Sequence, residues 1–128
     1  MDAPGREPMT YRTVVANLLE AFPELRDAYE TERRHWSAET PDPYTVYREA
    51  FDPYIEQVLD TGNEAALTRV FDFLERMAQT GDTDVVALLG TQTLEHLAKN
   101  DKRLEKARGQ MGPATLALSL QGAPPDEQ

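Results

Sequence analysis

The chain has 128 residues, 40% of them hydrophobic, and its 23 acidic and 13 basic side chains give a formal net charge of −10. This length predicts one compact domain and leaves no room for a second catalytic domain. The acidic balance argues against a nucleic-acid partner, because such binding depends on clustered Lys and Arg. The absence of cysteine excludes a thiol nucleophile, a disulfide and a cysteine zinc site.

The two ends of the chain are rich in helix-breaking residues. Residues 1–8 contain two prolines and a glycine and lack the basic start and apolar run of a secretory signal, so we expect a flexible N-terminal arm. Residues 121–128 contain a glycine and two prolines and predict a flexible C-terminal tail. No stretch approaches the roughly 20 apolar residues of a membrane helix. We therefore expect an all-helical domain over 9–120 in a soluble, cytoplasmic protein that does not contact a membrane.

The first half of that domain should begin with two helices. Leu and Ala number 29 against 8 for Val and Ile, which favours helix over strand. Apolar residues three and four positions apart predict a helix over 10–22, and Pro23 should end it and start another over 23–36. The side chains expected to face inward from this second helix are Leu25, Ala28, Tyr29 and Trp36. A loop over 37–43 follows, where two prolines flank Asp42.

A third helical region follows residue 43 and contains Pro53. Proline lacks a backbone donor, so we expect a kink or a break at this point, with Asp52 capping the second half. Gly62 and Asn63 should end this region and start a fourth helix, whose apolar stripe runs from Leu67 to Ala78.

The last third of the chain predicts further short helices. A helix over 85–98 must form a hairpin with the one before it, and residues 100–110 predict a short basic helix. A break at Gly112-Pro113 precedes a final turn in which Leu116, Leu118 and Leu120 alternate, so its helical signal is weak.

In total the sequence predicts an all-α domain of six to seven short helices in antiparallel hairpins. Residues 74–79 and 94–99 repeat the same residue types at an offset of 20. This offset is compatible with a HEAT-like stack, although the likeness of any two amphipathic helices is the favoured explanation.

Few residue constellations support catalysis. Glu32 and His35 have the spacing of half a carboxylate-bridged metal site, but Thr93 stands where the second histidine, His96, would need its carboxylate. There is no Gly-x-Ser-x-Gly elbow and no glycine-rich phosphate loop. We therefore expect no catalytic residue, no metal ligand and no cofactor, and a protein that is not an enzyme.

Charge is distributed unevenly along the chain. Residues 1–98 carry a balance of −11, whereas residues 99–121 carry +3. The basic side chains are Lys99, Lys102, Arg103, Lys106 and Arg108, and they either contact an anion or stabilise the helices that bear them. The acidic side combines carboxylates with tyrosines, a mixture that suits a protein interface. The partner-binding residues predicted on this basis are Asp42, Tyr44, Tyr47, Asp52, Tyr54, Glu56 and Asp60. The alternative is that the tyrosines fill the core.

Three segments resemble those of a family of small, all-helical bacterial proteins without assigned activity. They are Phe51-Asp52-Pro53-Tyr54, residues 70–78 and Met111-Gly112-Pro113-x-Thr115. The likeness extends from about residue 18 to residue 120. It implies a helical domain in a bacterial cytoplasm, similar to the small acidic immunity and accessory proteins found beside toxins, and it carries over no catalytic residue.

These observations support three hypotheses about function. The first is a non-catalytic protein-binding module, of the immunity type, that captures a basic protein through its acidic face. The second is a small-ligand or metal-binding domain with a cleft at Pro53, formed by His35, Trp36, Tyr47 and Tyr54. The third is a homodimeric structural protein that associates through an uncovered apolar helix face.

Overall fold

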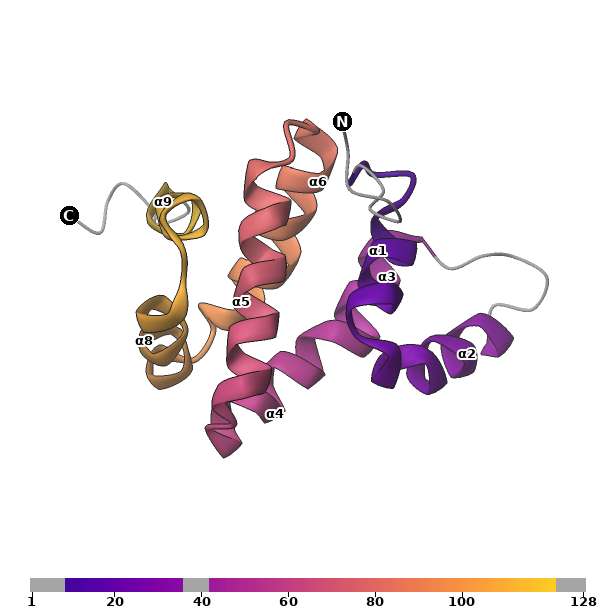
Figure 1. Cartoon of the computed structure of the whole chain (residues 1–128), viewed down its shortest axis with the longest axis horizontal. Coiled ribbons are helices and arrows are strands. Elements are labelled where there is room, and N and C mark those ends of the chain that lie inside the picture. Colours follow the sequence, from indigo (N-terminus) through magenta and orange to yellow (C-terminus); the bar gives the residue numbers. More distant parts are fainter. Residues whose placement is uncertain (1–8, 36–41, 122–128) are drawn as a thin grey trace.

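A computed structural model of the chain describes residues 9–35 and 42–121, and every regular element within these ranges is a helix (Figure 1). The all-α prediction is confirmed. The α-helices are α1 (Val14–Ala21), α2 (Arg26–His35), α3 (Pro43–Val46), α4 (Asp52–Thr61), α5 (Glu64–Gln79), α6 (Thr83–Leu88), α7 (Glu95–Leu97), α8 (Asp101–Gln110) and α9 (Pro113–Gln121). A 3-10 turn, η1 (Pro23–Leu25), and two π-helical segments, η2 (Tyr47–Phe51) and η3 (Leu89–Leu94), connect some of them.

The longest helix, α5, lies in the middle of the molecule (Figure 1). Helices α4 and α6 pack against it, and α8 and α9 lie on the side away from α1 and α2. Aromatic side chains join the end of α1 to η2 and α5. The ring centroid of Phe22 lies 5.4 Å from that of Phe51 and 5.6 Å from that of Phe73. All three are buried, so edge-on and tilted ring contacts form the centre of the hydrophobic core.

The corner at Phe22-Pro23 forms as predicted, because Pro23 opens the η1 turn that leads into α2. Leu25 is buried and Tyr29 is half-buried, as expected for neighbours four residues apart. Ala28, predicted to face inward, is exposed. The reason is that α2 lies at the edge of the molecule, where only the stripe through Leu25 and Tyr29 is covered (Figure 1). Trp36 lies outside the described residues.

Of the two outcomes expected at Pro53, a kink or a break, the break does not occur. The backbone remains right-handed helical from α3 through η2 into α4, and the amide of Asp52 donates to the carbonyl of Tyr47, five residues earlier. This π-type turn immediately precedes Pro53, which then occupies the first turn of α4, where a missing N–H is tolerated. The prediction that Asp52 caps this helix is wrong, because its side chain forms no cap and is buried instead.

The end and start signals predicted at Gly62 and Asn63 are present. Gly62 ends α4 in the left-handed conformation, with φ of 72°, and the Asn63 side chain accepts a hydrogen bond from the amide of Ala66. Asp82 caps α6, which packs beside α5 as the predicted hairpin (Figure 1). The final segment, for which the alternating pattern was weak, is a complete helix, α9. None of the described helices is long and apolar enough to cross a membrane.

Candidate functional site

Two of the seven predicted partner-binding residues lie inside the protein. The Tyr47 side chain is 0% exposed, and its hydroxyl donates to the carbonyl oxygen of Val14 at 2.9 Å. Burial raises the pKa of Tyr47 well above its ordinary value. Asp52 is 1% exposed. Neither side chain is accessible to a partner in this fold, so the alternative that tyrosines fill the core holds for Tyr47.

Three other predicted residues have local roles near the surface. The carboxylate of Asp42 accepts a hydrogen bond from the amide of Thr45 at 2.9 Å and so caps α3. Tyr44 is half-buried, with its ring centroid 6.4 Å from that of Tyr11. The hydroxyl of Tyr54 donates to Oε2 of Glu24 at 2.5 Å. These contacts orient the three side chains, and the two tyrosine rings stay partly exposed.

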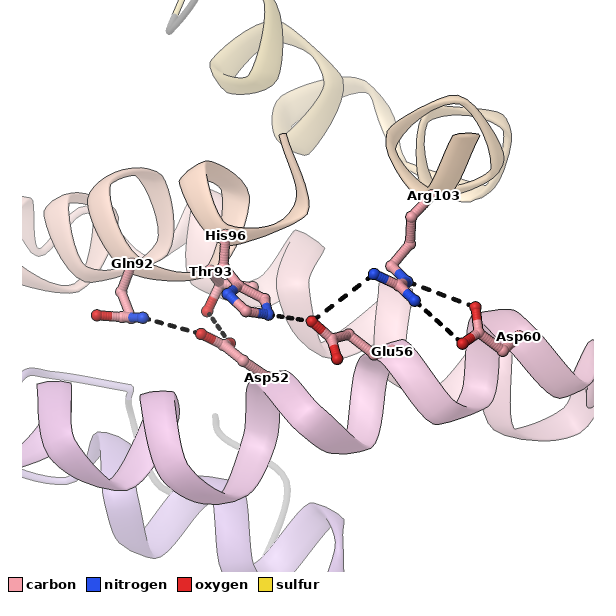
Figure 2. A network of polar contacts seen from close by, with 7 residues as sticks. All are labelled: Asp52, Glu56, Asp60, Gln92, Thr93, His96 and Arg103. Atoms are coloured by element: carbon pink, nitrogen blue, oxygen red, sulfur yellow. Dashed lines mark hydrogen bonds and ion pairs between the residues drawn. The ribbon is translucent and has the colours of Figure 1, made fainter. Parts of the chain in front are cut away.

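The remaining carboxylates form an internal line of contacts, which we name the polar seam. Asp52, Glu56 and Asp60 lie four residues apart on one face of α4, and this face is turned toward η3, α7 and α8 (Figure 2). Oδ2 of Asp52 accepts from Nε2 of Gln92 at 3.0 Å, and Oδ1 accepts from the Thr93 hydroxyl at 3.1 Å. Burial raises the pKa of Asp52, although these two hydrogen bonds act in the opposite direction.

The outer part of the polar seam is made of contacts between carboxylates and basic side chains. Nε2 of His96 contacts Oε2 of Glu56, and the guanidinium of Arg103 lies 3.8 Å from the same oxygen (Figure 2). Arg103 also donates from Nη2 to Oδ2 of Asp60 at 3.1 Å. The carboxylates expected to steer a partner therefore hold α4 against α7 and α8. Asp60 is the most accessible of them, with a side chain that is 57% exposed.

The sequence shows that the carboxylates of the polar seam share one face of α4, but it suggests that this face meets water. A spacing of four residues places Asp52, Glu56 and Asp60 on one face, which acidic residues normally turn toward water. Gln92, Thr93 and His96 also share one helical face, and together the two sets make a complementary pair. Only the side-chain contacts of the folded chain show that these faces meet.

The polar seam brings carboxylates and an imidazole together, and this combination suggests a metal centre or acid–base chemistry. Within 9–35 and 42–121, however, no group of three or more His, Asp or Glu side chains is arranged to hold a metal ion. Each carboxylate of the seam is already engaged by a neighbour. The spacing of Glu32 and His35, which was expected to hold no metal, is not tested, because the side chain of His35 lies outside the described residues.

A second polar cluster lies on the surface between η1, α4 and α5. Arg69 donates to Glu24 from both terminal nitrogens, at 3.1 and 3.2 Å, and to the carbonyl of Ala21 at 2.8 Å. Desolvation, the largest influence on Glu24, acts upward, but its hydrogen bonds with Arg69 and Tyr54 lower its pKa overall. Desolvation and the neighbouring Glu24 raise the pKa of Tyr54 to about 12. The cluster closes the corner between α1 and α2 onto the central helix.

Glu75 attaches the C-terminal helix to α5. Its carboxylate accepts from the amides of Ala114 and Thr115, both at 3.0 Å, and from the Thr115 hydroxyl at 2.8 Å. It therefore occupies the position of an N-terminal cap for α9, supplied by another helix. A Cβ atom at Gly112 would lie 2.5 Å from Oε1 of Glu75. The segment Met111-Gly112-Pro113-x-Thr115, which carried part of the resemblance, is thus a structural tether.

The basic side chains of residues 99–108 fall into two groups, arginines that contact another side chain and lysines for which the described residues show no ion pair. Arg103 belongs to the polar seam, and Arg108 donates to the side chain of Ser119 at 2.9 Å. Lys99, Lys102 and Lys106 are exposed and have no ion pair in the part of the chain that the structure describes. Beside Lys106 lies a hollow of about 320 Å³ between α4, α5 and α8.

A family model described as a domain of unknown function, DUF7674, matches residues 15–123. The chain belongs to this family. Comparison with curated proteins finds no match, and neither does comparison with solved structures. The predicted membership of a family without assigned activity is confirmed. The likeness to immunity proteins, the bacterial source and the HEAT-like stack stay predictions.

Proposed function

We propose that this domain is a non-catalytic protein-binding module. The supporting observation is that its buried polar side chains satisfy one another. Among the described residues, no buried side-chain nitrogen or oxygen lacks a hydrogen-bond partner. A site that reacts with a substrate usually keeps polar groups available for it, whereas a fully satisfied network holds a scaffold in one arrangement. The polar seam fits the second description.

The partner in this proposal is a basic protein, as in immunity-type inhibition, and the carboxylates that attract it differ from those predicted. The acidic exterior is defined by the exposed carboxylates of α1, α2, α5, α6 and α7 that form no ion pair in the described part of the chain: Glu20, Asp27, Glu64, Asp72, Asp84 and Glu95. Together with the net charge of −10, they supply a field that speeds the approach of a positively charged partner. Tyr44 and Tyr54 remain available as partly exposed aromatic contacts.

The experiment is photo-crosslinking in the source organism. A photoreactive residue is placed at Glu64 or Asp72 of the acidic exterior, and at Arg26 as a position of opposite charge. A discrete crosslinked protein, identified by mass spectrometry, would then be purified. Its association with the Glu64→Lys and Asp72→Lys double variant should be slower and less dependent on salt. Failure to crosslink at any exposed position, or association that the reversal leaves unchanged, would refute the proposal.

One observation favours homodimerisation as a second candidate function. Leu120 is the large hydrophobic side chain most exposed among the described residues, at 56%, and it lies on α9, which carries no charged residue. A charge-free helix allows two acidic copies to approach each other. Sedimentation across a concentration series tests this: a dimer that Leu120→Ser dissociates supports it, and a monomer throughout excludes it.

The cleft hypothesis loses one of its predicted members. Tyr47, expected to line a cleft at Pro53, is fully buried with its hydroxyl on Val14. Two other expected contributors, His35 and Trp36, have side chains outside the described residues, and the fourth, Tyr54, is half-buried with its hydroxyl on Glu24. No contact among the described residues favours this hypothesis over the protein-binding module.

A further inference from the structure

The three lysines of this chain occur within eight residues of one another, at 99, 102 and 106. Spacings of three and four residues place Lys102 and Lys106 on the same side of α8. Every lysine is exposed, and within 9–35 and 42–121 none forms an ion pair. The cations that do stabilise the fold are arginines, so the lysines form a separate group of uncommitted positive charges.

The helix dipole does not explain where these lysines lie. A cation is favoured in the last turn of a helix and disfavoured in the first. Lys102 is the second residue of α8, in its first turn, and Lys106 is near its middle. Only Lys99, which follows α7, has the position that the dipole favours. The stabilisation of helices therefore accounts for one of the three.

The hollow next to Lys106 has an apolar floor and a rim with free donors. It is lined by Leu59, Asp60, Thr61, Gly62, Leu67, Lys106 and Gln110. Leu59 and Leu67 are almost fully buried and form its floor. The carboxylate of Asp60 is occupied by Arg103, at 3.1 and 3.4 Å. The uncommitted side chains on the rim are thus the Lys106 ammonium and the Gln110 amide, and both can donate hydrogen bonds.

We propose that Lys99, Lys102, Lys106 and the adjoining hollow form a docking surface for an acidic segment of a partner protein. One aliphatic side chain of that segment enters the hollow and covers Leu59 and Leu67. Carboxylates beside it pair with Lys102 and Lys106. A volume of about 320 Å³ is at the lower end of the range for small-molecule pockets and suits a single anchoring side chain.

The negative charge of the whole protein does not prevent this docking. At physiological ionic strength, charges more than about 8 Å apart are largely screened, so nearby lysines dominate the potential that a bound segment meets. Residues 99–121 carry a local balance of +3, which includes Asp101 and Glu105 beside the lysines, while one of its cations, Arg103, is paired with Asp60. The surface is distinct from the acidic exterior, and it extends the proposed function, because a domain with both surfaces connects a basic partner to an acidic one.

The probe is a short synthetic peptide in which leucine is flanked on both sides by glutamates. We expect saturable amide shifts in the NMR spectrum that centre on Gly62, Lys106 and Gln110. A peptide with alanine in place of leucine, and one with lysines in place of the glutamates, should bind much more weakly. Binding should also weaken as salt is added, because exposed ion pairs are screened.

Two variants with equal charge separate a local effect from the overall field. Lys102→Glu with Lys106→Glu should weaken peptide binding by about tenfold or more. Arg26→Glu with Arg34→Glu makes the same change in net charge on α2 and should have little effect. Gln110→Trp, which fills the hollow from an exposed position, should also abolish binding while circular dichroism shows an unchanged helix content.

Equal weakening by both charge reversals, or shifts spread over the whole protein, would refute the docking surface. Absence of saturable binding by the leucine peptide would refute it as well. The acidic exterior is tested separately through Glu64 and Asp72, so a partner crosslinked there with no peptide binding at α8 would refute only this inference. Peptide binding at α8 without any crosslinked partner would refute the proposed capture of a basic protein.

Discussion

Replacing Glu75 with alanine should release α9 from α5. The substitution removes an acceptor from two amides and from the hydroxyl of Thr115, which is 0% exposed. Loss of a helix cap costs about 0.5–2 kcal/mol, and a buried hydroxyl left without a partner costs about 1–3 kcal/mol. Because the two effects overlap, we expect the free energy of unfolding to fall by about 1–4 kcal/mol, which corresponds to roughly 0.5–2 M in urea midpoint.

The assay combines urea unfolding with hydrogen exchange. Amides of α9 should lose protection in Glu75→Ala more than those of α5, since the broken contacts lie at the start of α9. Asp72→Ala is the matched control: it removes an exposed carboxylate from the same helix and should cost about 0.5 kcal/mol or less. If the two variants unfold at the same urea concentration and α9 stays protected, the tether contributes nothing and the reasoning is wrong.

A double-mutant cycle with Gly112 tests the geometry directly. A Cβ atom at this position would lie 2.5 Å from Oε1 and 2.6 Å from Cδ of Glu75, so Gly112→Ala must displace the carboxylate from α9. The same substitution in the Glu75→Ala background meets no carboxylate. We expect a coupling energy of about 1 kcal/mol or more. Additive effects of the two substitutions would show that Gly112 is not required for the approach of Glu75.

The other predictions concern pH, tyrosine ionisation and backbone conformation. Desolvation raises the pKa of Glu75, but hydrogen bonds from Ala114 and Thr115 lower it overall, below its ordinary value of 4.5. The stabilisation that Glu75 provides should therefore be complete above pH 4.5 and decline as the pH falls through the lowered pKa. The urea midpoints of the wild type and Glu75→Ala should converge at that low pH. Burial raises the pKa of Asp52 above 3.8, so ionisation of this carboxyl should destabilise the fold as the pH rises through the raised pKa. Asp52→Asn should remove this pH dependence of the free energy of unfolding. An unchanged pH profile in the variant would contradict the prediction. Tyr54 has a pKa of about 12, raised by desolvation and by the neighbouring Glu24 carboxylate, so it should ionise at lower pH in Glu24→Gln. An ultraviolet absorbance titration measures this. If the transition did not move, desolvation alone would set the pKa. Gly62→Ala should lower the free energy of unfolding by about 1–2 kcal/mol, because the backbone φ at this position is 72°. Gly109→Ala, inside α8, should raise it by about 0.5–1 kcal/mol. Thermal unfolding of the two variants would contradict this if both melting temperatures moved in the same direction.

Polar residues at the helix ends were sufficient to place most helices. Asn63, Asp82 and Asn100 each cap the helix that follows, and Gly62 ends α4 in the left-handed conformation that it adopts readily. These signals can be read from the sequence because a cap bonds to amides only two or three residues away. An irregularity at Pro53 follows from its missing N–H, but the form that it takes, a π-type turn in place of an interruption, cannot be read from local spacing.

The sequence by itself determined that this chain is helical, acidic and composed of one domain, because residue propensities, caps and net charge are local or additive properties. Only the tertiary structure decided which polar groups meet one another. Asp52 finds its partners about 40 residues away on η3, and Glu75 finds its own at the start of α9. Helical spacing tells which residues share a face, but it carries no information on whether that face meets water or another helix. For this reason the carboxylates predicted to attract a partner hold the fold together instead.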